Sequence, residues 1–315
     1  MGTSPPHSVG RAPSRIGAPS GPDRGSGALR IGLLNLMPDA PATHAQFARL
    51  LLRGPQAVRL HSLRLDAPRG RAAPYLLQTG RPWRAAISEG LDGLIVTGAP
   101  VETLPFEAVT YWAEFCALIE AARARLPRTL YICWSAQAAL WHAHRVPKHA
   151  LPRKAFGVFR QEACSSSPLL EGLGASFPAP VSRHTEVREA DLPPSIAVLA
   201  RSDRSGLCLL AEEDCRTVYM FNHLEYDPGT LQGEYERDRA AGRDTGPPAF
   251  DRGLAAPGVW LPAGRRFFRN WLADAARCRL PGTVERRPAW SRQHSRNIGR
   301  IGRHALETWA VHRDD

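Results

Sequence analysis

Short apolar runs alternate with amphipathic stretches along most of the chain. The apolar, strand-like runs lie at 30–37, 58–65, 93–98, 129–133 and 216–223. Between them, apolar residues recur at helical spacing in 43–53, 107–123 and 264–277. This alternation predicts a three-layer α/β fold, with a mainly parallel sheet covered by helices on both faces. Two further runs joined by a short link, 195–201 and 206–212, predict additional antiparallel strands. The aromatic residues of the helical stretches are expected in the core.

Both ends of the chain lack this pattern. Residues 1–29 are rich in Gly, Pro and Ser and cannot bury enough apolar surface to offset their ordering entropy, so we expect a disordered extension. Residues 30–278 should form the folded domain, and 279–315 a basic tail.

The net charge of +11 is concentrated in the ends, with +3 in residues 1–30 and +4 in residues 279–315. A basic tail can bind polyanions. However, arginine outnumbers lysine 39 to 2, which indicates a coding bias toward arginine. We therefore favour a solvated tail over a nucleic-acid-binding arm.

The composition is that of a cytoplasmic enzyme. No apolar stretch reaches the length that crosses a bilayer, and the N-terminus lacks the apolar core of a signal peptide. The six cysteines are widely spread, without a CxxC pair or a metal-ligand spacing, so we expect reduced thiols, mostly buried, and no metal site. They are Cys116, Cys133, Cys164, Cys208, Cys215 and Cys278.

Cys133 stands where an apolar run, Thr129-Leu-Tyr-Ile132, meets a helix-like run, Trp134-Ser-Ala-Gln-Ala-Ala-Leu140. A sharp strand-to-helix turn presents a nucleophile at the carboxyl end of a sheet, and the helix N-terminus favours thiolate. Ser135 and Ala136 are small enough to let a substrate approach. Taken alone, Cys133 would fit a buried structural cysteine as well.

His223 ends another strand-like run and is followed two residues later by Glu225. A cysteine, a histidine and a group that orients the imidazole form the minimal unit of thiol catalysis. We therefore interpret Cys133, His223 and Glu225 as nucleophile, base and orienting carboxylate.

These residues belong to an ordered set of motifs that resembles the homoserine O-acyltransferase family, also called homoserine O-succinyltransferase. Its fold is related to class I glutamine amidotransferases. The matching segments span residues 30 to 275: Ile31-Gly-Leu-Leu-Asn-Leu-Met-Pro38, Asp92-Gly-Leu-Ile-Val-Thr-Gly-Ala-Pro100, Tyr111-Trp112, the Cys133 turn, Gly157-Val-Phe159, Ser182-Arg-His-Thr-Glu186, His223-Leu-Glu-Tyr-Asp227 and Phe268-Arg-Asn-Trp-Leu272.

The resemblance implies acyl transfer in two halves, in the biosynthesis of methionine and other sulfur amino acids. Cys133 would take an acyl group from acyl-CoA, a co-substrate, and His223 would then activate the hydroxyl of an amino acid. The oxyanion would bind the N–H of Trp134, with another N–H from the Thr97-Gly98-Ala99 turn. The resemblance implies that no cofactor is needed. It also implies that the protein forms a homodimer.

The resemblance also assigns substrate contacts. Arg237 would hold the amino-acid carboxylate, Lys154 and Ser182 match substrate-binding positions, and Glu225 could meet the ammonium group. Glu102 lies at a position that distinguishes members of the family. Glutamate at this position accompanies acetyl transfer, and glycine accompanies succinyl transfer. A carboxylate there would repel a succinyl carboxylate, so acetyl-CoA is the expected donor.

Several departures from the family pattern leave the acceptor open. Asp39-Ala-Pro-Ala42 replaces a segment that usually carries a lysine and a glutamate, and the motifs at Val181-Ser-Arg183, His223-Leu-Glu225 and Trp260-Leu-Pro-Ala263 also differ. Homoserine is the first candidate and serine or a related hydroxy amino acid the second. A glutamine amidotransferase-like hydrolase, or a binding protein on the same fold, is the alternative of another class.

Overall fold

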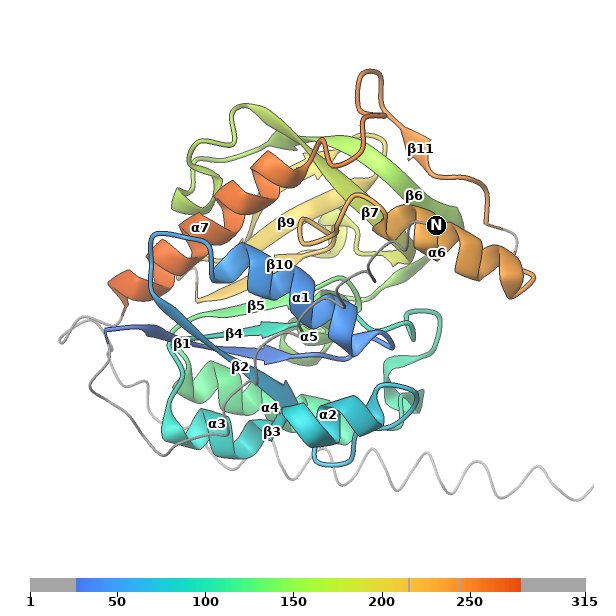
Figure 1. Ribbon diagram of the computed structural model, residues 1–315. Coiled ribbons are helices and arrows are strands. Elements are labelled where there is room, and N and C mark those ends of the chain that lie inside the picture. The colour runs from blue at the N-terminus through green and yellow to red at the C-terminus, as the bar shows by residue number, and fades with distance from the viewer. Residues whose placement is uncertain (1–26, 215, 244, 279–315) are drawn as a thin grey trace, which may run out of the picture.

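A single large mixed sheet organises the chain in a computed structural model that describes residues 27–214, 216–243 and 245–278 (Figure 1). The predicted tails, 1–29 and 279–315, lie almost wholly outside these residues. The strands are β1 Leu29–Leu34, β2 Val58–Arg64, β3 Arg81–Pro82, β4 Gly93–Val96, β5 Thr129–Ile132, β6 His149–Ala163, β7 Ser176–Glu186, β8 Ile196–Ser202, β9 Gly206–Glu212, β10 Thr217–Met220 and β11 Ala249–Phe250. The helices are α1 Ala40–Leu51, α2 Ala73–Thr79, α3 Trp83–Glu89, α4 Trp112–Arg125, α5 Trp134–His144, α6 Thr230–Ala240 and α7 Leu261–Arg277.

The sheet runs in the order β11-β6-β8-β9-β10-β5-β4-β1-β2-β3, with β7 paired to β6. From β3 to β10 the strands are parallel, as predicted. The pairs β10–β9, β9–β8, β8–β6 and β6–β7 are antiparallel, so the predicted β8–β9 hairpin is confirmed.

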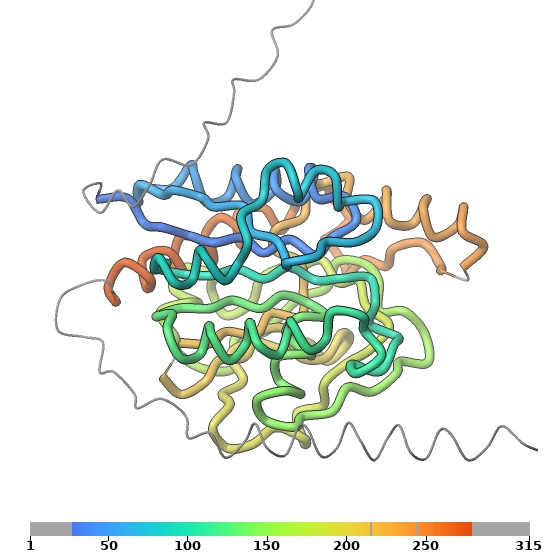
Figure 2. The backbone as a smooth tube through the Cα atoms, turned by 90° about the horizontal axis from the view of Figure 1, so that it is seen from below, coloured from blue at the N-terminus to red at the C-terminus, as the bar shows by residue number. Residues whose placement is uncertain are grey.

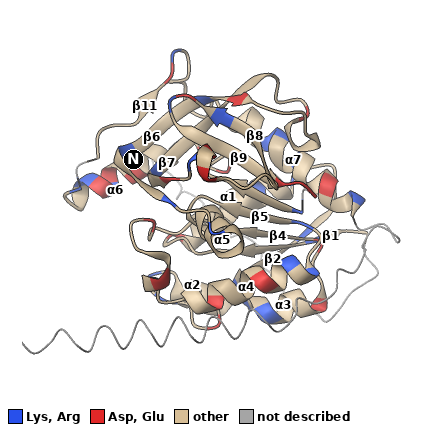
Figure 3. Cartoon of the chain, turned by 180° about the vertical axis from the view of Figure 1, so that it is seen from behind, with Lys and Arg blue, Asp and Glu red and all other residues tan. Residues whose placement is uncertain are grey.

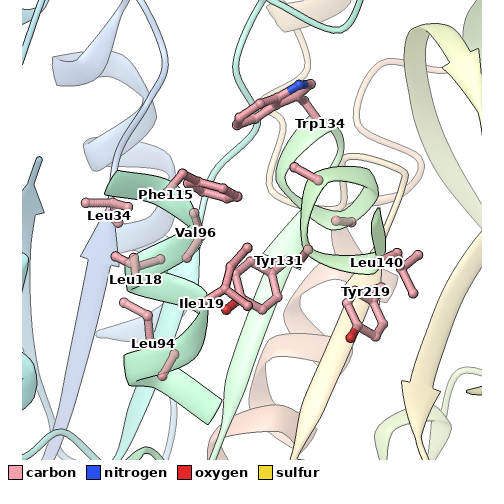
Figure 4. Close-up of a cluster of buried hydrophobic side chains, with 14 of the residues drawn as sticks. Leu34, Leu94, Val96, Phe115, Leu118, Ile119, Tyr131, Trp134, Leu140 and Tyr219 are labelled. Atoms are coloured by element: carbon pink, nitrogen blue, oxygen red, sulfur yellow. The ribbon is translucent and has the colours of Figure 1, made fainter. Parts of the chain in front are cut away.

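Helices cover both faces of the parallel half, and successive strand residues alternate between them. In β5, Leu130 and Ile132 pack with α1 and α7, whereas Tyr131 faces α4 and α5. Figure 4 shows Tyr131 on the α4–α5 side of the sheet. Outside these layers, α6 projects at one end of the molecule (Figure 2). The three-layer prediction is confirmed.

The helix aromatics are mostly core residues, as expected. Phe47, Phe115, Phe267, Phe268 and Trp271 are buried. The helix predicted from 107 begins later, at Trp112, because Phe106–Ala108 forms a separate 3₁₀ turn and Val109 is extended.

The long hairpin of β6 and β7 was not predicted. The first half of β6 is only partly buried and includes Pro152 and Arg153, so no alternation of apolar and polar residues marks it as a strand. Gly157 is required in it, with φ at +143°, because a Cβ there would stand 1.8 Å from the carbonyl oxygen of Ala249 in β11.

The five described cysteines carry thiols and form no disulfide. Cys133 and Cys208 are buried, Cys116 and Cys278 are partly buried, and Cys164 is exposed, so the expectation that most are buried is wrong for these residues. Cys215 lies outside the described residues. No described helix combines the length and apolar character that a membrane span requires.

Candidate active site

Cys133 occupies the sharp turn between β5 and α5 that the sequence predicted. Its φ of 55° and ψ of −118° place a non-glycine residue in a strained region, held by a hydrogen bond from its N–H to Met220 O at 2.7 Å. Such strain at a nucleophile turn aims the side chain out of the strand direction.

The turn depends on two close neighbours. Ser135 is fully buried, and its hydroxyl accepts from Ile132 N at 2.9 Å and lies 2.9 Å from Val96 O and Ile132 O, so it ties the ends of β4 and β5 together. Its role is structural, rather than to make room for a substrate. A Cβ on Gly98 would stand 3.1 Å from Cys133 Cβ, so only glycine fits there without displacing the nucleophile.

The side chains of His223 and Glu225 contact each other, as the sequence analysis expected. His223 Nδ1 is 2.7 Å from Glu225 Oε1, and both residues are buried. The His223 ring also stacks on Tyr226, with centroids 4.2 Å apart. This leaves Nε2 as the ring nitrogen that can exchange a proton with Cys133 or a substrate.

The electrostatics favour a protonated His223. Burial lowers the pKa of His223, but the charges of Glu225 and Cys133 outweigh it and hold that pKa well above its usual value. Two other cysteines are unsuited to act as nucleophiles. Burial raises the pKa of Cys116 and of Cys208 to about 12, which keeps those thiols protonated and unreactive.

Strand β7 connects the catalytic residues, although the sequence did not reveal it. Pro180 O accepts from His223 N at 2.9 Å, and the guanidinium of buried Arg183 donates to Asn222 at 2.8 Å. Thr185 exchanges hydrogen bonds with Gln137 of α5. The strand therefore joins the histidine loop to the helix that follows the nucleophile.

A cavity of about 280 Å³ opens in front of Cys133 and His223. Four of the five predicted substrate contacts line it: Glu102, Lys154, Ser182 and Arg237. The carbonyl oxygen of Ser182 lies 4.0 Å from Cys133 Sγ. Glu225 is not among the lining residues and lies behind His223, so it is poorly placed to meet a substrate ammonium.

Trp134 packs in the core through its indole and begins α5 with its backbone. Its indole is buried against Phe115, at 5.1 Å between centroids, and against Tyr111. Its backbone N–H is the first of α5 and has no acceptor within the helix. That geometry suits the predicted oxyanion donor.

Three cations that line the cavity meet at one buried carboxylate, which lines it as well. Asp238 accepts from Lys154 Nζ at 2.8 Å, and from Arg237 and Arg243 at 3.2 Å. Burial raises the pKa of Asp238, but the hydrogen bonds and charges of Lys154 and Arg237 lower it more. The excess positive charge suits an anionic group of a substrate.

Glu234 is a second acidic residue of this wall. Its Oε1 accepts from Tyr226 at 2.7 Å, whereas its Oε2 is buried and has no hydrogen-bond partner among the described residues. Sequence reasoning missed Glu234, Asp238 and Arg243. The signal was present, because Glu234, Arg237 and Asp238 share one face of α6 at the spacing i, i+3, i+4. Figure 3 shows acidic and basic residues side by side on this helix.

A family model described as homoserine O-succinyltransferase matches residues 21–277. The chain belongs to this family. The family resemblance inferred from the motifs is thus confirmed, and with it the class of enzyme, an acyltransferase. Family membership decides against the hydrolase and the binding-protein alternatives.

Individual relatives agree with the family. The chain is 44% identical to a homoserine O-acetyltransferase of Novosphingobium aromaticivorans over 78% of its length and 84% of that protein. It is 46% identical to a homoserine O-acetyltransferase of Brucella canis, with the same coverage of both chains. Among solved structures, a glutamine amidotransferase from Methylobacillus flagellatus superposes with a TM-score of 0.52 at 14% identity, covering 79% of this chain and 95% of that one. This last likeness confirms the predicted fold.

Proposed function

We propose that the protein transfers an acetyl group from acetyl-CoA to the side-chain hydroxyl of homoserine through an acyl-cysteine. The observation that carries the proposal is the Cys133, His223 and Glu225 constellation beside a cavity that is also lined by Lys154, Arg237 and Arg243. The names of the curated relatives support both homoserine and acetyl as substrates.

In the first half-reaction, Cys133 Sγ attacks the thioester carbonyl carbon. The tetrahedral oxyanion is stabilised by the backbone N–H of Trp134 and by the Gly98 turn. The bond from the acyl carbon to the sulfur of CoA then breaks, and CoA leaves as a thiol with the proton of the His223 imidazolium.

In the second half-reaction, His223 must act as a base. Acylation removes the negative charge of Cys133, one of the two charges that raise the pKa of His223. The imidazole is therefore more readily neutral in the acyl-enzyme than in the free enzyme. It takes the proton of the acceptor hydroxyl, the oxygen attacks the acyl carbon, and the Cys133 thiolate is released.

The acceptor site follows from the charges of the wall. The carboxylate of the amino acid would pair with Arg237 and Arg243, and its ammonium with the unpartnered Oε2 of Glu234. Lys154 holds Asp238 in place behind them. Homoserine and serine carry the same two charged groups and differ by one methylene.

Serine remains the second candidate because the loop before α1 lacks polar side chains that the family usually carries. Met37 and Pro38 line the cavity, Ala40 is buried, and Asp39 caps α1 by accepting from Ala42 N at 3.2 Å. An apolar wall of this kind discriminates only modestly between acceptors that differ by a methylene.

The test is to follow the release of free CoA by the purified protein. Acetyl-CoA and succinyl-CoA are each combined with homoserine, serine and threonine, with Cys133→Ser as the inactive control. We expect the highest kcat/KM with acetyl-CoA and homoserine. A preference for serine would transfer the assignment to the second candidate, and CoA release that requires no hydroxy amino acid would refute both.

A further inference from the structure

The Glu102 loop forms one wall of the cavity with little support of its own. It joins β4 to the 3₁₀ turn at Phe106, and within it Val101 N donates to Ala99 O at 2.9 Å and Leu104 N to Val101 O at 3.1 Å. Thr103, Leu104 and Pro105 are exposed. No described residue hydrogen-bonds the carboxylate of Glu102, so this charge is available to face an acyl group in the cavity.

Lys148, from the segment between α5 and β6, clamps this loop from outside. Its Nζ donates to the carbonyl oxygens of Glu102 and Leu104, each at 2.5 Å, and lies 4.3 Å from the centre of the Phe106 ring. Phe106 is buried and stacks on Trp112 and Trp141, so the ring is a fixed support.

The geometry of the clamp explains why this position is a lysine. Two carbonyl oxygens and a ring face converge on a single point charge, which a compact ammonium satisfies and a planar guanidinium does not. Burial lowers the pKa of Lys148, while the carboxylates of Glu102 and Glu107 oppose this. In a chain with 39 arginines, the two lysines are Lys148 and the buried Lys154 of the cavity wall.

We propose that Lys148 is a positioning residue for donor selectivity, because it fixes the loop that holds Glu102 against the acyl pocket. This inference rests on the proposed function, in which the Glu102 carboxylate repels a succinyl group. A loop released from the clamp lets the carboxylate move away, so a longer, charged acyl group is excluded less strongly.

The experiment measures kcat/KM for succinyl-CoA and for acetyl-CoA in Lys148→Met, which keeps the side-chain length and removes the donors. We expect the succinyl-to-acetyl ratio to rise about 10-fold, the scale of one lost charge-assisted hydrogen bond. In a two-step transfer, kcat/KM for the acceptor reports the second half-reaction, and it should change less than about twofold. Lys148→Gln, which keeps an N–H donor group but removes the charge, should give an intermediate ratio and serves if Lys148→Met does not fold.

Two further variants make the result specific. Arg64→Met is the matched control, because Arg64 also donates to loop carbonyls, of Leu65 and Asp66 at 3.0 Å, and does not line the cavity. It should leave the donor ratio unchanged. Lys148→Met added to Glu102→Gly should shift the ratio by less than about twofold further, since Lys148 acts through Glu102.

Each outcome bears on one hypothesis. If Glu102→Gly raises the ratio and Lys148→Met does not, the role of Lys148 is refuted while the proposed function stands. An equal fall of kcat/KM for both donors and the acceptor in Lys148→Met would reduce Lys148 to a structural residue and also overturn the inference. If Glu102→Gly leaves the ratio unchanged, the proposed donor selectivity itself is refuted.

Discussion

Replacing Glu225 by glutamine isolates the charge of the orienting carboxylate. The substitution keeps the size of a side chain that is buried and bonded to His223 Nδ1 at 2.7 Å. It removes one negative charge, which we place at about 4 Å from the positive charge of the imidazolium for an order-of-magnitude estimate. At an effective dielectric constant of about 20, that charge stabilises the imidazolium by about 4 kcal/mol, a factor of about 10³ in rate. The amide can also bind the wrong imidazole tautomer, which extends the expected loss in kcat to 10³–10⁴-fold, roughly the range known for such changes.

The assay is CoA release from acetyl-CoA at saturating homoserine. The pKa of His223, followed by NMR of the imidazole protons, should fall in Glu225→Gln, because burial, which lowers it, remains and the main raising charge is gone.

Glu212→Gln is a matched control. Glu212 is a partly buried carboxylate, with 13% of its side chain exposed, that is bonded to a histidine, His144, at 3.0 Å and lies outside the cavity. The Glu212→Gln enzyme should keep nearly the kcat of the wild type at temperatures below the unfolding temperature of the variant. A Glu225→Gln enzyme within tenfold of the wild type would refute the orienting role of Glu225.

Three further predictions concern the nucleophile, its turn and the stability of the fold. Cys133→Ser should fold normally and lose turnover, and mass spectrometry of the wild type with acetyl-CoA alone should find one acetyl group on the Cys133 peptide; an adduct on another cysteine would contradict the mechanism. Gly98→Ala should lower kcat at least about tenfold with a small loss of stability, because its Cβ would press on Cys133 Cβ at 3.1 Å; unchanged kinetics would show that the nucleophile tolerates displacement. Burial raises the pKa of Glu212, but hydrogen bonds and charges from His144, Arg123 and Tyr219 lower it more, from 4.5 to about 2. Its contribution of about 3 kcal/mol is therefore present above pH 4.5 and lost as the pH falls toward 2. In urea unfolding, the stability deficit of Glu212→Gln should shrink by about half between pH 7 and pH 3, and a constant deficit would count against this pairing.

The sequence by itself determined the layered architecture and pointed to the candidate catalytic residues. Apolar runs and helical spacing are local properties, so they can be read along the chain before the packing partners of each element are known. The Cys133 turn and the His223 and Glu225 pair were equally readable, because each depends on residues that are adjacent along the chain.

Only the tertiary structure decided how these parts combine. The β6–β7 hairpin is built from irregular, partly polar stretches and is stabilised by pairing between residues distant in sequence, such as Phe156 with Ser182. Likewise, the clamp of Lys148 on the Glu102 loop joins residues 46 positions apart, and Lys154 meets Asp238 across 84 positions. The charge of a lysine or an aspartate is visible in the sequence, but which partner it neutralises depends on where the folded chain places the other charge. For that reason the nucleophile and several residues of its cavity could be inferred from the sequence, whereas the charges that complete the wall, Glu234, Asp238 and Arg243, could not.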